Sequence, residues 1–447
     1  MKKMLALLPL LFFFTLVAQK KNSLDTILYQ MQFAAKQQLL DKYYPRNIDT
    51  GYGGYLSTFA YNLQPTGGQD KMIVTQSRHV WSTAKAALFY NDTAYTSMAR
   101  HGYLFLRDKM WDSVYGGFFN LVNRQGIVKS EMKEAYGNSF AIYALAAYYQ
   151  CSKDTNALRL AQQAFNWLEA HSHDKHNKGY YQHLARNGTP MKRKASTPGT
   201  SALGYKDQNS SIHLLEAFTE LYSVWPHPLL KSRLLELLLL IRDTMVTPKG
   251  YLQLFFTPRW VPVSFKDSSK AFILSHHNLD HISFGHDVET AYLMMEAAAA
   301  LGLEGDPATM VVAKRMVDHA LQNGWDTNNG GFYDEAYYFK NAPNITVTEE
   351  TKNWWAQAEG LNTLLIMDGL YPGEKMQYLR HFKKLWQYVQ SYLIDHEYGD
   401  WYEGGLDKQP EKRTALKAHI WKGTYHNFRA LSNCIRLLQK QAGGINH

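Results

Sequence analysis

Three histidines lie near the starts of predicted helices, each beside residues that could help it to move a proton. His286 and Glu289 are three positions apart and therefore share one helix face. Asn209 and His213 are four apart and do the same, and His426 opens the last predicted helix. An imidazole exchanges protons readily because its pKa lies near neutral pH. The spacing predicts acid–base chemistry, although each histidine alone would also be typical of a buried helix start.

Residues from other predicted helix starts could join these histidines. Arg78 and Trp354 each lie near the start of a predicted helix. If such helices run in one direction around a ring, their N-termini meet at one end, and residues distant in sequence converge on one pocket. The partial positive charge of helix N-termini would also stabilise an oxyanion that develops during proton transfer.

A glycine-aromatic signature repeats along the chain and indicates what positions these helices. Glycine followed by alternating aromatic residues is typical of a tight turn that enters a short strand. A signature that recurs at intervals of roughly 60 to 80 residues predicts a repeat architecture. The six copies are GYGGYL at Gly51, YGGFF at Tyr115, KGYYQ at Lys178, KGYLQ at Lys249, NGGFYDE at Asn329 and YGDWYEG at Tyr398.

Pairs of helices are predicted between the signatures, because apolar residues recur there at helical spacing. Segments 24–43 and 426–440 add one helix at each end. If these terminal helices pack together, twelve helices close into an all-α (α/α)6 barrel with short β-hairpins at one mouth, a single catalytic domain over residues 19–447. The paired helices are 77–90, 94–110, 137–150, 155–171, 209–224, 227–246, 287–301, 307–322, 355–370 and 374–395.

The N-terminus and the composition limit the location and the class of the protein. Residues 1–18 combine Lys2 and Lys3 with an apolar run that is short for a membrane span, which predicts a signal peptide and an exported, periplasmic or secreted protein. A retained anchor is the alternative. The net charge of +9 is scattered along the chain, which argues against a nucleic-acid binder. An aromatic content of 14% fits a large core or a groove for sugar rings.

Several other kinds of site are not supported by the sequence. It has no GxSxG elbow, no GxGxxG after a strand and no P-loop. His277 and His281 could share a helix face, but the residues between them lack the base of an HExxH zinc motif. We therefore expect no metal and no cofactor. A glycoside hydrolase would need two acidic groups across the mouth, for which the candidates are Asp287, Glu289, Glu335 and Asp400.

Five stretches of the chain resemble the N-acylglucosamine 2-epimerase superfamily, and within it the cellobiose 2-epimerases. The resemblance extends over nearly all of the chain after residue 18, and it implies an (α/α)6 fold with cofactor-free, reversible inversion at C2 of an aldose. The stretches are SRHVW at Ser77, KDQNSSIHLLEAFTELYSVWP at Lys206, SFGHDVETAYLMMEAA at Ser283, KNWWAQAEG at Lys352 and WKGTYHNFRA at Trp421.

The resemblance also implies roles for individual residues. His286 and His426 would be the acid/base pair that moves the C2 proton through an enediolate. Glu289 would support His286, and Arg78 would hold the sugar oxygens near C1 and C2. His213 would assist ring opening. The other substrate-binding residues that it implies are Asn209, Trp354 or Trp355, Trp421, and Trp401 beneath a second sugar unit.

Departures from the family pattern leave the substrate open. Asn353, Ala356, Phe428 and the Gly423-Thr424 pair differ from the usual residues, and the stretch 403–420 looks longer. The aldose could be a glucose or mannose unit, free or at the reducing end of a β-linked disaccharide such as cellobiose or mannobiose, or an N-acylated sugar. We expect a monomer or a weak homodimer. The alternatives are an aldose–ketose isomerase, a glycoside hydrolase and a non-catalytic carbohydrate-binding barrel.

Overall fold

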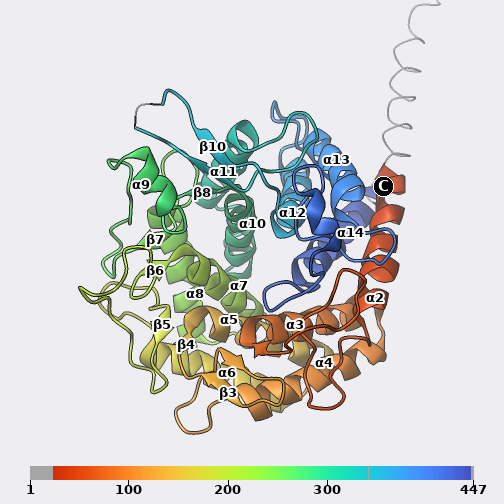
Figure 1. The fold of residues 1–447 in the computed structure, drawn as a ribbon, viewed down its shortest axis with the longest axis vertical. Coiled ribbons are helices and arrows are strands. Elements are labelled where there is room, and N and C mark those ends of the chain that lie inside the picture. Colours follow the sequence, from red (N-terminus) through yellow and green to blue (C-terminus); the bar gives the residue numbers. More distant parts are fainter. Residues whose placement is uncertain (1–23, 341, 444–447) are drawn as a thin grey trace, which may run out of the picture.

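The computed structural model describes residues 24–340 and 342–443, and its long helices form two concentric rings (Figure 1). Neighbouring inner helices contact one another around a closed circle, in which α14 returns to α3. This arrangement confirms the (α/α)6 barrel. The inner helices are α3 (Ile73–Tyr90), α5 (Ala135–Ser152), α7 (Gln208–Val224), α10 (Phe284–Ala300), α12 (Trp354–Leu370) and α14 (Tyr425–Gly443).

The outer ring supplies the second helix of each hairpin. Its first member is residues 24–33, which continue through η1 (Ala34–Leu40) into α2 (Asp41–Tyr43). The terminal helices pack together as expected, because η1 contacts α14. The other members are α4 (Thr93–Phe105) with η2 (Leu106–Met110), α6 (Thr155–His171), α8 (Pro228–Leu240) with η3 (Ile241–Met245), α11 (Pro307–Asn323), and α13 (Tyr378–Tyr388) with η4 (Val389–Leu393).

Short antiparallel strands lie where the inner helices begin. Strands β1 (Lys71–Met72), β4 (Lys133–Glu134), β6 (Lys206–Asp207) and β8 (Ile282–Ser283) each run directly into an inner helix. They pair with β2 (Leu121–Val122), β5 (His183–Leu184), β7 (Phe255–Phe256) and β9 (Glu335–Tyr337), and β3 (Val128–Ser130) and β10 (Thr346–Glu349) extend two of these sheets. The shorter helices α9 (Lys270–Ser275) and η5 (Pro410–Thr414) lie in connections at this mouth.

Each glycine-aromatic signature forms a closed turn at the end of an outer helix. A residue just before the turn forms an antiparallel bridge with an aromatic or apolar residue just after it. The glycines permit the turn: Gly117 has a φ of +71°, and a Cβ there would lie 2.8 Å from the Trp167 ring. The six bridges are Ile48–Tyr55, Trp111–Phe118, His173–Tyr180, Val246–Leu252, Trp325–Phe332 and Ile394–Trp401.

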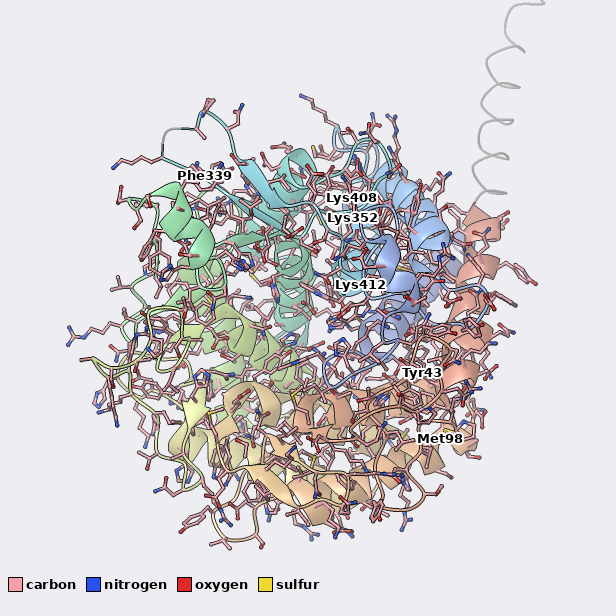
Figure 2. The ribbon with its side chains drawn as sticks, viewed as in Figure 1. Tyr43, Met98, Phe339, Lys352, Lys408 and Lys412 are labelled. Atoms are coloured by element: carbon pink, nitrogen blue, oxygen red, sulfur yellow. The ribbon has the colours of Figure 1, made fainter. Side chains whose placement is uncertain are left out.

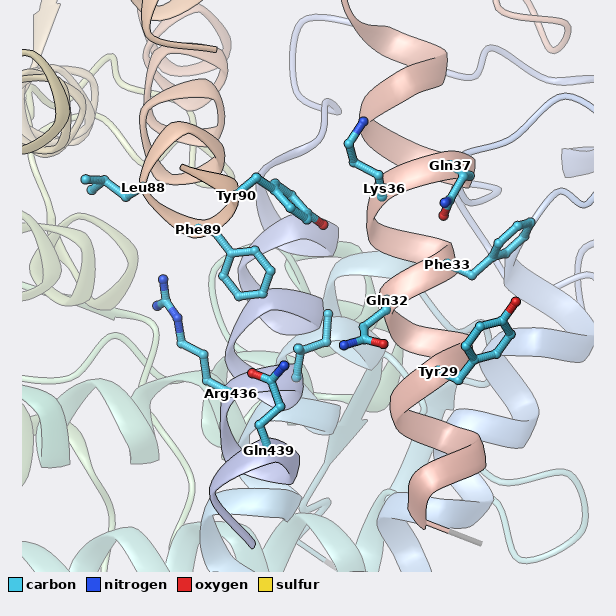
Figure 3. A pocket seen from close by; sticks show the side chains of 11 residues that line it. Tyr29, Gln32, Phe33, Lys36, Gln37, Leu88, Phe89, Tyr90, Arg436 and Gln439 are labelled. Carbon is cyan, nitrogen blue, oxygen red and sulfur yellow. The ribbon is translucent and has the colours of Figure 1, made fainter. Parts of the chain in front are cut away.

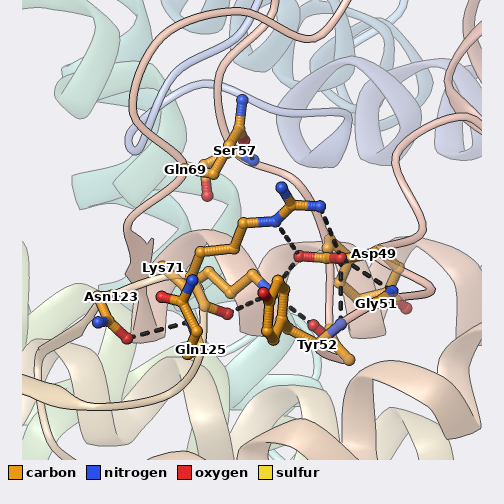
Figure 4. Close-up of polar contacts among 12 residues, drawn as sticks. Asp49, Gly51, Tyr52, Ser57, Gln69, Lys71, Asn123 and Gln125 are labelled. Atoms are coloured by element: carbon orange, nitrogen blue, oxygen red, sulfur yellow. Dashed lines mark hydrogen bonds and ion pairs between the residues drawn. The ribbon is translucent and has the colours of Figure 1, made fainter.

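A buried lysine ties most of these turns to the start of an inner helix. Lys71 donates a 2.9 Å bond to Asp49, whose carboxylate also accepts bonds from Arg124 and from the backbone of Gly51 (Figure 4). A buried ammonium group requires such a partner. The turn and the helix start are thereby held together at the mouth. Equivalent pairs are Asp112–Lys133, Asp174–Lys206 and Asp326–Lys352, and in the last repeat Asp395 pairs with Lys417, eight residues before α14.

The fourth repeat lacks this ion pair. Thr247 stands at the position of the aspartate. Ile282 begins β8, whereas β1, β4 and β6, which also run into inner helices, begin with lysine. Replacement of both partners by an uncharged pair avoids a stranded charge, which is why it is tolerated.

Lysines also fasten the connection between the last signature and α14 to the barrel (Figure 2). Lys352 bonds Asp407 at 2.8 Å, Lys408 bonds Glu350 at 2.6 Å, and Lys412 bonds Glu403 at 2.6 Å. The predicted signal peptide, residues 1–18, lies outside the described residues. Within those that are described, no helix has the length and apolar character needed to cross a membrane.

Candidate active site

A pocket of about 200 Å³ opens at the mouth where the inner helices begin. Its walls come from the first turns of these helices and from the residue four positions before α14. All the predicted site residues except Trp401 line it, and Tyr136 joins them. The lining residues are Arg78, Tyr136, Asn209, His213, His286, Glu289, Trp354, Trp355, Trp421 and His426.

Trp401 lies elsewhere, in the core of the last repeat. Its side chain is only 1% exposed, and it forms the bridge with Ile394 that closes the sixth signature turn. A ring buried in this way offers no face to a sugar. Trp401 occupies the same place in its repeat as Phe118 and Tyr180 do in theirs. The expected contact of Trp401 with a second sugar unit therefore does not fit its buried position.

Each of the three pocket histidines is held through its Nδ1 atom. In His286 this atom lies 2.9 Å from the Ser283 hydroxyl, and in His426 it lies 2.6 Å from Glu359 Oε1. His213 Nδ1 lies 2.9 Å from Glu216 Oε2. Among the described residues, none makes a hydrogen bond to the Nε2 atom of these rings. Nε2 is therefore the nitrogen available to a ligand.

The Trp355 ring lies close to both histidines of the expected acid/base pair. Its centroid is 4.7 Å from that of His286 and 5.9 Å from that of His426. Trp421, at the mouth, is 47% exposed. The pocket thus offers aromatic faces beside both imidazoles, as the apolar faces of a sugar ring require.

Arg429 joins three buried glutamates beneath the pocket. Its guanidinium donates to Glu216 and Glu289, and it also lies 2.7 Å from Glu359. Tyr425 adds a 2.6 Å bond to Glu216. Glu289 thus contacts Arg429, whereas His286 is held by Ser283, so the expected support of His286 by Glu289 does not correspond to a direct contact.

Sequence reasoning missed this ionic cluster. Arg429 stands three residues after His426 in WKGTYHNFRA, and Glu216 follows His213 at the same three-residue spacing as Glu289 follows His286. That spacing was a usable signal for the His213–Glu216 pair. No local pattern links His426 to Glu359, because these residues lie on different helices and are 67 positions apart.

Burial and neighbouring charges set the protonation of the cluster. Burial and the charge of Glu359 raise the pKa of Glu289 to about 8. Burial alone would raise the pKa of Glu216, but Arg429 and His213 lower it to about 2. At neutral pH Glu289 is therefore protonated, and Glu216 is an ionised partner of Arg429.

The same environment keeps the histidines neutral. Burial, and then the charges of His213, His281 and His426, lower the pKa of His286 to about 3. Burial and then Arg78 and Arg429 hold the pKa of His426 well below its usual value. A neutral imidazole whose hydrogen is on Nδ1 has a free lone pair on Nε2, and in that tautomer either ring can act as a base.

Arg78 is a fixed cation beside them. Its two terminal nitrogens donate to the Trp421 carbonyl at 3.0 Å and to the Tyr136 hydroxyl at 3.1 Å. The guanidinium also lies over the Phe140 ring, 4.6 Å from its centroid. Such a preorganised charge can stabilise an oxyanion that forms in the pocket.

The low pKa of His286 predicts a pH-dependent stability. An unfolded chain protonates this ring below its ordinary pKa of about 6.5, whereas the folded chain does so only near 3, so stability falls as the pH drops between these values. From about pH 7 to about pH 5, urea unfolding of the wild type should lose about 1 to 2 kcal/mol more than that of His286→Asn. Parallel losses in both proteins would mean that the ring titrates normally.

A larger hollow, of about 640 Å³, lies at the other end of the barrel (Figure 3). It is bounded by η1 and the helix before it, by the end of α3 at Leu88 to Tyr90, and by α14 at Arg436 and Gln439. Because these are the C-terminal parts of the inner helices, the hollow is separate from the three histidines. Its size does not make it the active site.

A family model for N-acylglucosamine 2-epimerase matches residues 54–430, which is most of the chain. The chain belongs to this family. The cellobiose 2-epimerase of Bacteroides fragilis is 28% identical over 426 residues, 93% of this chain and 100% of the relative. A D-mannose isomerase of Marinomonas mediterranea is 24% identical and aligns with 89% of this chain and 94% of its own.

A solved structure extends the likeness to the fold. The cellobiose 2-epimerase of Spirochaeta thermophila superposes with a TM-score of 0.79 at 27% identity, over 94% of this chain and 98% of that one. Family and relatives together make the protein a carbohydrate isomerase or epimerase.

In this member of the family, the acidic residues considered for hydrolysis have other partners. Asp287 accepts the backbone N–H of Leu252, and Asp400 pairs with Lys422. Glu289 contacts Arg429, and Glu335 contacts His277. A hydrolase requires two carboxyl groups that face each other across the substrate. Of these four, only Glu289 lines the pocket.

Proposed function

We propose that the protein is a sugar 2-epimerase, which inverts C2 of an aldose reversibly and without a cofactor. The observation that carries the proposal is the position of His286 and His426 in one pocket, both beside the Trp355 ring and neither with a hydrogen bond to its Nε2 atom among the described residues. Inversion at a carbon requires one proton acceptor and one proton donor on opposite faces. Two imidazoles meet this requirement when one ring is neutral and the other carries an added proton.

The reaction would proceed through an enediolate of the open-chain sugar. One neutral imidazole takes the proton from C2, and the electrons of that C–H bond move into the enediolate. The other ring, protonated from solvent once the enediolate has formed, returns a proton to the opposite face of C2, and the first ring then releases its proton to water. Arg78 would stabilise the oxyanion, and Glu359 would stabilise the imidazolium form of His426.

For the substrate we infer a glucose or mannose unit, free or at the reducing end of a β-linked disaccharide. Support comes from relatives that are named cellobiose 2-epimerase and D-mannose isomerase. A pocket of about 200 Å³ is small beside the roughly 300–1,000 Å³ of typical ligand sites, which favours one sugar ring within it. Trp421, exposed at the mouth, is available to a second ring.

Proton NMR in deuterated water tests the proposal. The purified protein is incubated separately with cellobiose, mannobiose, glucose, mannose and N-acetylglucosamine. We expect deuterium at C2 together with the epimeric sugar for at least one of them, and that sugar identifies the substrate. Intact sugars without exchange across the panel would contradict the proposal.

The same spectra distinguish the epimerase from the second candidate function, an aldose–ketose isomerase. The D-mannose isomerase relative favours this second candidate. Both reactions begin with loss of the C2 proton, but an isomerase returns it at C1. A ketose as the main product would therefore identify the protein as an isomerase and contradict the epimerase proposal. Release of monosaccharide from a disaccharide would instead indicate hydrolysis.

A further inference from the structure

Two histidines and a glutamate meet at the active-site mouth, outside the pocket. His277 and His281 follow the short helix α9, and Glu335 begins β9. His277 Nδ1 lies 2.9 Å from Glu335 Oε2, and His281 Nε2 lies 3.8 Å from Glu335 Oε1. One nitrogen or oxygen from each of the three residues lies within 4.8 Å of the other two.

These separations fit a transition-metal ion. Bonds of about 2.0–2.1 Å to imidazole nitrogen and carboxylate oxygen place neighbouring tetrahedral ligand atoms about 3.3 Å apart. The observed distances to the two Glu335 oxygens, 2.9 and 3.8 Å, lie on either side of that value, and one ligand atom from each residue lies within 4.8 Å of the other two, so side-chain shifts would bring all three to one ion. Two imidazoles with one carboxylate is a common ligand set for zinc and related ions.

The His281 ring is already in the tautomer that binds a metal. Its Nδ1 lies 2.5 Å from the carbonyl oxygen of His277. A carbonyl can only accept, so Nδ1 carries the hydrogen and Nε2 of the neutral ring keeps its lone pair. Metal-binding histidines commonly donate their second N–H to a backbone carbonyl in this way. The lone pair is on the side of Glu335.

The backbone that carries these ligands is fixed. Ser283 in β8, two residues after His281, is paired in register with Glu335 in β9. Asp280 anchors the preceding turn, because its carboxylate accepts the Phe265 N–H at 2.6 Å and the Tyr337 hydroxyl at 2.7 Å. The ligands are therefore preorganised, as a metal site requires.

The local charge also favours a cation. Within the described part of the chain, Glu335 contacts these two histidines and forms no ion pair with a lysine or arginine. The side chains are open to solvent, with 54% of His277, 16% of His281 and 21% of Glu335 exposed, so an ion can enter. A second cluster, Glu289, Glu359 and His426, already holds the cationic Arg429.

We propose that His277, His281 and Glu335 form a binding site for a divalent transition-metal ion such as Zn²⁺. The remaining coordination positions face solvent and would hold water. The site is separate from the epimerisation pocket, and no step of the proposed reaction passes through it. On binding, the ion would replace the hydrogen bond between His277 Nδ1 and Glu335, and the hydrogen of the His277 ring would then be on Nε2.

Titration of the purified protein with Co²⁺ tests the site. Co²⁺ bound to nitrogen and carboxylate ligands with low coordination number absorbs visible light much more strongly than the hydrated ion. We expect one strongly absorbing Co²⁺ per chain, displaced by one equivalent of Zn²⁺. Absence of this absorption would overturn the proposal.

Variants locate the ion. His281→Ala and Glu335→Gln should each weaken binding by more than about 100-fold, since even residues behind a metal ligand contribute 10- to 100-fold. His276→Ala, next to His277 but outside the cluster, and His426→Ala, in the second cluster, should bind as the wild type does. Unchanged binding in both Glu335→Gln and His281→Ala, or loss in His426→Ala, would contradict the site. Circular dichroism confirms that each variant is folded.

Discussion

Replacement of His426 by asparagine is expected to lower kcat/KM for epimerisation by about 10²–10⁴-fold, with the fold retained. Asparagine occupies a similar space and can still hydrogen-bond Glu359, but it cannot accept and release a proton. The change should appear mainly in kcat, because the residue acts on the reacting carbon and Arg78 and the tryptophans that line the pocket remain. Epimer formation followed by NMR measures the rate, and thermal unfolding reports on the fold.

His173→Asn is the matched control. His173 also contacts a glutamate, with its Nε2 2.9 Å from Glu236 Oε1, but it lies in a signature turn away from the pocket. Its variant should keep nearly full activity per folded molecule. Wild-type turnover by the His426 variant would remove this residue from the proposed mechanism, and equal losses in both variants would point to a general effect of histidine removal.

Replacement of Arg429 by methionine is expected to lower the free energy of unfolding by about 3–5 kcal/mol. Arg429 is 3% exposed and contacts Glu216, Glu289 and Glu359, which are themselves almost fully buried. Methionine replaces part of the apolar volume but none of the charge. Glu216, whose pKa is lowered to about 2 largely by this arginine, would be left ionised in a poorly solvated site or forced to take up a proton. Urea unfolding at neutral pH measures the loss.

Two further variants serve as controls for Arg429→Met: loss of an exposed arginine, and removal of a carboxylate that Arg429 contacts. Arg107→Met removes a partner of Asp108, and both side chains are about half exposed, so the cost should stay below about 1 kcal/mol. Addition of Glu216→Gln to Arg429→Met should recover part of the lost stability, because it removes the stranded carboxylate. If Arg429→Met unfolds at the same urea concentration as the wild type, the cluster is not a stabilising one.

Most of the barrel could be predicted from the sequence, because it rests on local patterns that repeat. Helical spacing of apolar residues gave the long helices, and the glycine-aromatic signature marked each turn between repeats. The inner helices begin up to four residues earlier than expected; α3, for example, starts at Ile73 rather than at residue 77. The short strands run directly into these helices, and strand-to-helix boundaries carry little signal in apolar, β-branched residues such as Ile73 and Val74.

The convergence of the site residues also followed from the sequence, whereas their partners did not. Spacing within one helix determines that His213 and Glu216 share a face, and a parallel inner ring brings the helix starts to one mouth. Contacts between helices depend on the rotation of each helix about its axis and on its shift along that axis relative to its neighbours. No local sequence pattern determines these two quantities. Tertiary packing alone therefore placed Glu359 against His426, gave Glu289 to Arg429 and brought Glu335 to His277 and His281. It also buried Trp401, because this residue forms the bridge with Ile394 that closes the sixth signature turn.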